Sequence, residues 1–109
     1  MKTRTRGVPI PHKVRDALRA RSQGRCERCG QLADRLDAHH RQQRSCGGQD
    51  VLSNLVHVDR MCHDRIHDTN DYDDGWLVRS WDDPRDVPIR LWLGPVRLGD
   101  GGEAVKESG

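Results

Sequence analysis

The sequence predicts an α+β fold, a small domain built on a strand–loop–strand–helix (ββα) unit. The segment Leu36–His40 alternates loosely between apolar and polar residues, which is typical of a short strand. A loop with two adjacent glycines, Gly47 and Gly48, separates it from a second apolar segment at Asn54–Val58. Residues 60–68 then follow a helical pattern. These observations place two strands and one helix in consecutive order.

Composition limits the size of the hydrophobic core. The chain has 109 residues, of which 33% are apolar and 33% charged, and it contains no phenylalanine. Such a chain forms at most one domain, so we expect a bound metal to help hold it together. The sequence has no apolar run that suits a signal peptide or a transmembrane helix. This pattern favours a cytoplasmic protein.

The charge is distributed unevenly along the chain. Residues 1–49 carry twelve Lys/Arg and four Asp/Glu, a balance of +8, whereas residues 50–109 carry seven and thirteen, a balance of −6. A basic half that contains the adjacent histidines suits a site for a polyanion. An uneven but merely solvated surface is the alternative interpretation.

The first expected element is a helix that begins at Pro11. We interpret residues 1–10 as a basic N-terminal arm, because they lack an apolar period. Val14 and Leu18 share one face of the helix, and Gly24 lies just past its end, where glycine commonly follows a helix. The arginines on its other faces either contact phosphate or form a solvated surface.

Cys26 and Cys29 form a C-x-x-C pair followed by a glycine. This spacing brings two sulfurs to one tetrahedral ion, as in half of a zinc knuckle. A redox pair is disfavoured because no thioredoxin-like strand precedes it. Cys62 is the expected third ligand. The fourth stays open between His57 and Asp59, which is also a suitable cap for the following helix.

The histidines predict a second metal site. His63 and His67 are four residues apart on a helix, so both can hold one ion. His39 or His40 supplies a third nitrogen, which leaves the other imidazole free to move a proton. Three ligands with open positions describe a catalytic site better than a structural one. The adjacent histidines point to opposite faces of a regular strand, so a shared site requires a departure from strand geometry.

The C-terminal part is expected to cover the ββα unit. We expect Ile66 and Met61 to be the inward contacts of the helix, and Trp76–Trp81 to form an outer strand. A second apolar segment lies at Val87–Leu93, and the tryptophans are expected to fill the core. The domain spans residues 11–98, and residues 99–109 are interpreted as a disordered tail.

The ordered motifs resemble those of HNH endonucleases, closest to the small proteins of bacteriophages and prophages. The motifs that carry the resemblance are Cys26-x-x-Cys29, His39-His40-Arg41, Gly47-Gly48, Asn54-Leu55-Val56, Cys62-His63 and Ile66-His67. The resemblance implies a small ββα-metal (His-Me finger) core, with an N-terminal helix, a zinc-knuckle-like C-x-x-C and a short C-terminal β cover.

The resemblance also implies a role for each matching residue. His40 corresponds to the general base and His39 to the metal ligand beside it, while Asn54 corresponds to the residue that steadies the loop. His63 and His67 correspond to the helical metal ligands. Two departures concern cysteine positions: Asp59 stands where zinc-knuckle members have a cysteine, and Cys46, expected to be a free thiol, stands where a basic or polar residue is common.

The implied activity is metal-dependent hydrolysis of phosphodiester bonds in DNA, by nicking or double-strand cleavage. It would use one divalent ion (Zn, Ni, Co, Mn or Mg) beside a structural zinc, and leave a 5′-phosphate and a 3′-hydroxyl. The expected partners are DNA and, in the bacterial host cytoplasm, phage terminase or portal components, with a role in packaging or gene mobility. The expected contacts to the DNA backbone are Arg41, Arg44, Arg60 and Arg65.

Two rival functions use the same residues. A zinc-stabilised DNA-binding module without catalysis would combine the C-x-x-C pair with His63 and His67. However, 33 residues separate Cys29 from His63, against roughly twelve in a finger. A structural zinc protein that binds another protein is the third interpretation. Both leave the adjacent histidines and Asn54 without a role.

Overall fold

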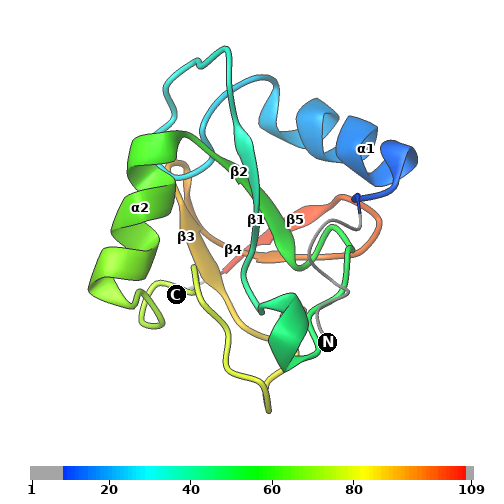
Figure 1. The fold of residues 1–109 in the computed structure, drawn as a ribbon, viewed down its shortest axis with the longest axis vertical. Helices are drawn as coiled ribbons and strands as arrows, with labels where there is room; N and C mark the ends of the chain where they lie inside the picture. Colours follow the sequence, from blue (N-terminus) through cyan, green and yellow to red (C-terminus); the bar gives the residue numbers. More distant parts are fainter. Residues whose placement is uncertain (1–8, 108–109) are drawn as a thin grey trace.

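A computed structural model describes residues 9–107. Within this range the elements are α1 (His12–Ser22), β1 (Asp37–His40), a 3-10 turn η1 (Arg44–Cys46), β2 (Leu55–Val58), α2 (Arg60–Thr69), β3 (Ile89–Leu91), β4 (Gly94–Leu98) and β5 (Ala104–Lys106). The strands form two antiparallel sheets, β1–β2 and β3–β4–β5. The predicted α+β class is confirmed (Figure 1).

The ββα unit forms as the sequence predicted. In the β1–β2 pair Asp37 lies opposite Val58 and His40 opposite Leu55. α2 begins directly after β2, because the Asp59 side chain accepts a hydrogen bond of 2.7 Å from the backbone N–H of Cys62 and so caps the helix. The two strands lie between α1 and α2 (Figure 1). All four residues of β2 are therefore buried.

The main core lies between α2, β2 and the C-terminal sheet. Of the three tryptophans expected to fill the core, only Trp76 does so, at 1% exposed, whereas Trp81 and Trp92 are 76% and 47% exposed. Ile66 of α2 is fully buried, but Met61, also expected to point inward, is 70% exposed. Cys62 and Ile66 are four residues apart and define the buried face of the helix, from which Met61 is turned away by about 100°. The Met61 prediction is wrong for this geometric reason.

The C-terminal cover differs from the prediction in two places. The chain from Trp76 to Trp81 forms turns and bends rather than a strand, and Trp81 is 76% exposed. The expected disordered tail contains β5, which pairs with β4. A tight turn makes this hairpin: Gly99 donates its N–H to the carbonyl of Glu103, and Gly102 has a φ of 92°. Residues 1–8 of the expected arm and 108–109 of the tail lie outside the described residues.

Arg41 is part of the core, and the expectation that it contacts DNA phosphate is wrong. Its side chain is fully buried, so no strand of DNA can reach it. The guanidinium donates hydrogen bonds of 2.7–3.0 Å to four backbone carbonyls, those of Ser53, Gly75, Pro84 and Val87. These bonds join the loop before β2 to the C-terminal cover. Sequence alone cannot separate such an arginine from a surface one.

Replacing Arg41 with alanine is expected to lower the free energy of unfolding by about 3 kcal/mol or more, because four carbonyls, two of them in buried residues, lose their donor. Urea unfolding followed by circular dichroism measures this. Arg65→Ala, on the exposed face of α2, is the matched control and is expected to stay within about 0.5 kcal/mol of the parent. Equal stability of the two variants would contradict the structural role of Arg41.

Candidate active site

Three histidines converge where β1 packs beside α2. His39 comes from β1, and His63 and His67 come from successive turns of α2. One ring nitrogen from each lies within 4.8 Å of the others, and the ring centroids are 5.1–5.4 Å apart. The i, i+4 spacing stacks the two helical rings on one face, and the strand brings the third ring against them. This cluster has the donor atoms and the spacing to hold one metal ion.

Hydrogen bonds orient two of the three rings. Nε2 of His39 lies 2.7 Å from the carbonyl oxygen of Trp76, which only accepts, so Nε2 carries the proton and Nδ1 keeps a lone pair. Nδ1 of His63 lies 3.0 Å from the Asp37 carboxylate, which leaves its Nε2 lone pair available. Metal-binding histidines commonly have such partners on their second nitrogen.

Asp37 was not predicted from the sequence. It stands two residues before His39, so both side chains leave β1 on the same face. The two-residue spacing between Asp37 and His39 is the sequence feature that could have pointed to Asp37.

Burial fixes the protonation state of His39. The ring is 1% exposed, and burial lowers its pKa to about 4 although the hydrogen bond to Trp76 acts in the opposite direction. The positive charges that His63 and His67 carry when protonated lower it further. The imidazole is therefore neutral at neutral pH, which is the form that donates a lone pair to a metal.

His40 lies beside the cluster without belonging to it. β1 keeps its strand geometry through His40, so the expected departure from it does not occur. Even so, His40 lines the same open surface hollow, about 440 Å³ in volume, as the three clustered histidines. Its Nε2 lies 2.7 Å from the carboxylate of Asp50. Because a carboxylate only accepts, Nε2 carries the proton and Nδ1 has the lone pair.

Asp50 is held in place from two sides. Arg44 donates to it from Nε at 3.1 Å and from Nη2 at 2.9 Å, and His40 donates to the same carboxylate. Although partial burial acts against it, these hydrogen bonds keep the pKa of Asp50 below its usual value, so the carboxylate is ionised. Asp50 lies in an irregular loop, and the sequence offered no signal for this contact.

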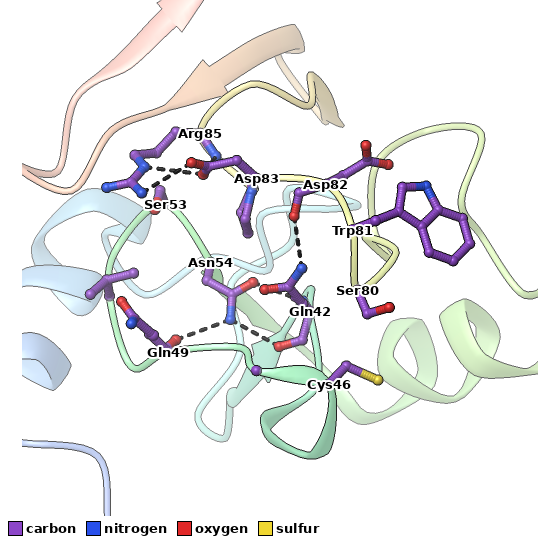
Figure 2. A pocket seen from close by; sticks show the side chains of 13 residues that line it. Gln42, Cys46, Gln49, Ser53, Asn54, Ser80, Trp81, Asp82, Asp83 and Arg85 are labelled. Atoms are coloured by element: carbon purple, nitrogen blue, oxygen red, sulfur yellow. Dashed lines mark hydrogen bonds and ion pairs between the residues drawn. The ribbon is translucent and has the colours of Figure 1, made fainter.

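Asn54 closes the loop between β1 and β2. Its side chain is fully buried and forms three hydrogen bonds to the backbone (Figure 2). It accepts from the N–H of Gln42 at 2.7 Å and donates to the carbonyls of Gln42 and Gln49 at 3.0 Å each. A Cβ at Gly48 would collide with the Gln42 carbonyl, so this close approach needs glycine. One side chain thus fixes both ends of the loop that carries Asp50.

The cysteines form a second cluster at the start of α2. The sulfurs of Cys26, Cys29 and Cys62 and a carboxylate oxygen of Asp59 lie within 4.8 Å of one another. One oxygen of Asp59 caps the helix, while the other accepts a hydrogen bond of 3.3 Å from the Cys29 thiol. Asp59 can therefore cap the helix with one oxygen and face the sulfurs with the other. Nδ1 of His57 lies 2.8 Å from Ser22 Oγ instead, outside this cluster.

Burial controls the ionisation of the cysteines. It raises the pKa of Cys62 to about 12 and that of Cys29 above its usual value, so both thiols are protonated without a cation nearby. A divalent ion bound to these sulfurs would reverse this preference and displace the protons. Three sulfurs and a carboxylate oxygen fit a tetrahedral zinc. Cys46, as expected, is a free thiol on the surface.

Residues 26–69 match the family model of the HNH endonucleases. This segment is an HNH domain. The match begins at Cys26 and ends after His67, so it includes both clusters, the β1–β2 pair and α2. Comparison with curated proteins and with solved structures found no match. Neither helix among residues 9–107 combines the length and apolarity needed to cross a bilayer.

The arginines expected to bind DNA lie in different settings within the HNH domain. Arg60 is exposed at the start of α2 and lies 3.5 Å from Asp37 and 3.7 Å from Asp64. Arg65 is exposed on the same helix. Arg44 lines the histidine hollow and is engaged by Asp50. Phosphate contacts by these three residues stay predictions.

Proposed function

We propose that this HNH domain is a metal-dependent endonuclease that hydrolyses phosphodiester bonds in DNA. One observation carries the proposal: three lone-pair nitrogens converge at the edge of a hollow that a fourth histidine, His40, lines with its own orienting carboxylate. A purely structural metal site has no use for that fourth imidazole.

His40 is the proposed general base. Its Nε2–H donates to Asp50, so Nδ1 accepts a proton from a water molecule in the hollow. The Asp50 carboxylate then stabilises the imidazolium that forms. The deprotonated water attacks phosphorus in line, the bond to the 3′ oxygen breaks, and that oxygen takes a proton from solvent water, so that the products carry a 5′-phosphate and a 3′-hydroxyl.

His39, His63 and His67 are the proposed ligands of the catalytic ion. When bound, a divalent ion would supply positive charge that stabilises the pentacoordinate phosphorus centre and the departing 3′ oxygen. Three nitrogens suit Zn²⁺, Ni²⁺, Co²⁺ or Mn²⁺ better than Mg²⁺. The hydrogen bonds to Trp76 and Asp37 keep the ligand rings oriented for this role.

The remaining residues hold these groups in place. Asn54 steadies the loop, and Cys26, Cys29, Cys62 and Asp59 are the proposed ligands of a structural zinc that would join the start of the domain to α2. DNA is the proposed substrate. The phage or prophage origin, the cytoplasmic location and the link to terminase or portal components stay predictions from resemblance, as do the roles in packaging or gene mobility.

Supercoiled plasmid incubated with the purified protein and a panel of divalent ions tests the activity. We expect conversion to open circles in at least one metal, none with chelator, and a loss of about 10²-fold or more in His63→Ala. Asp68→Ala, exposed on the same helix, is the matched control and should cut like the parent.

A folded, metal-loaded parent that leaves the plasmid intact in every metal would contradict the proposed activity. Retarded migration of the same DNA in a gel would then favour the non-catalytic binding module.

A further inference from the structure

A groove of about 500 Å³ runs between α1 and the ββα unit. Arg15 and Arg19 of α1 line one side, and Arg60 of α2 lines the other. The groove also reaches Asp37 and His63, the oriented carboxylate–histidine pair of the metal cluster. It therefore adjoins the histidine hollow, with which it shares Ala38 and His63.

Two cations of α1 face the groove without a partner among the described residues, whereas Arg21 at the end of the helix is paired with Glu27. Arg15 and Arg19 are exposed, and neither side chain has an ion pair or hydrogen bond within residues 9–107. They are four residues apart, so their side chains project from one face of the helix on successive turns. Asp16 is the acidic residue that α1 adds to the groove. The α1 wall therefore has excess positive charge beside the metal cluster.

A pocket on the other side of the loop between β1 and β2 is more acidic than the α1 groove. The pocket that contains the exposed Trp81 is lined by Asp82 and Asp83 (Figure 2). Arg85, which also lines it, is paired with Asp83 and Asp100. A polyanion that leaves the histidine hollow is repelled on this side and attracted on the α1 side.

We propose that the α1 groove binds the phosphates of the DNA strand that flanks the scissile bond, with Arg15 and Arg19 as the contacts. This inference rests on the proposed endonuclease function and assigns the direction in which the substrate leaves the active site. Arginine–phosphate contacts bind the backbone without reading bases. The groove thus adds affinity for DNA of any sequence.

Fluorescence anisotropy of a labelled duplex, titrated with the metal-loaded His40→Ala protein over a series of salt concentrations, tests the groove. In this background we compare Arg15→Gln/Arg19→Gln with Arg90→Gln/Arg97→Gln. The control pair removes the same charge from exposed positions outside the groove. The groove pair is expected to weaken binding about 10-fold or more and to reduce the salt dependence of log K by about 2. Circular dichroism verifies that both fold.

Three results would overturn the inference while leaving the endonuclease proposal intact. In the first, the parent cleaves DNA but the groove pair binds with the affinity and salt dependence of the control pair. In the second, the loss of affinity is confined to one of two duplexes of unrelated sequence, which would indicate base reading. In the third, the groove pair, in the otherwise parent protein, lowers kcat at saturating DNA instead of raising KM. Failure of the endonuclease proposal itself is distinct, because the parent then cuts nothing in any metal.

Discussion

Replacing His40 with alanine is expected to lower kcat for plasmid nicking by about 10²–10⁴-fold, the range that a positioned general base contributes. The variant should keep its fold. His40 is only half-buried, and the one described hydrogen bond of its ring is to the Asp50 side chain. The three clustered histidines come from the other face of β1 and from α2, so they should still bind metal. Nicking rates under saturating metal and DNA measure the effect.

The Asp50→Asn variant tests whether His40 acts as a general base or is a surface histidine without a catalytic role. The amide is close in size to the carboxylate but carries no charge to stabilise an imidazolium, so we expect kcat to fall about 10–100-fold with little change in KM. Asp86→Asn, an exposed aspartate without a described side-chain partner, is the control.

If His40→Ala, folded and metal-loaded, cuts at the rate of the parent, then His40 is not the base.

Local patterns predicted the elements that local interactions determine. The i, i+4 spacing of His63 and His67, the N-cap at Asp59 and the burial of Ile66 follow from helix geometry alone. The ββα order also followed from short apolar segments separated by a glycine loop. The HNH match over residues 26–69 agrees with the motifs that pointed to the family.

Tertiary contacts decided the features that sequence reasoning missed. Asp50 meets His40 only because the loop folds back under the control of Asn54. Arg41 and Arg44 both follow β1 in the same loop, yet Arg41 is fully buried and hydrogen-bonded to carbonyls, whereas Arg44 lines the hollow and pairs with Asp50. The spacing of apolar residues along the chain predicts neither the Asp50–His40 contact nor the burial of Arg41. β5 has only three residues, all exposed, and follows a segment rich in glycine and acidic residues, so no periodic pattern marked it as an edge strand paired through its backbone.

Removing metal from the cysteine cluster is expected to abolish cooperative folding. Cys26 is fully buried in the main core, and Cys62 lies beside it at the start of α2, so the cluster joins the two ends of the HNH domain. A structural zinc binds small domains with about 10–16 kcal/mol, which exceeds the whole stability of most small domains. With a small apolar core, this chain has little to replace that energy.

Thermal unfolding with and without a strong chelator, combined with metal analysis of the purified protein, measures this dependence. We expect tightly bound zinc in the parent, and loss of both the zinc and the unfolding transition in Cys62→Ser. Cys46→Ser, at an exposed thiol outside both clusters, should behave like the parent. His63→Ala should retain the zinc and most of the stability while losing activity, because its site serves chemistry rather than folding. A metal-free parent that unfolds at the same temperature with and without chelator would show that the cysteines pack as ordinary core thiols. In that case the cap made by Asp59 would be the sole contribution of that residue.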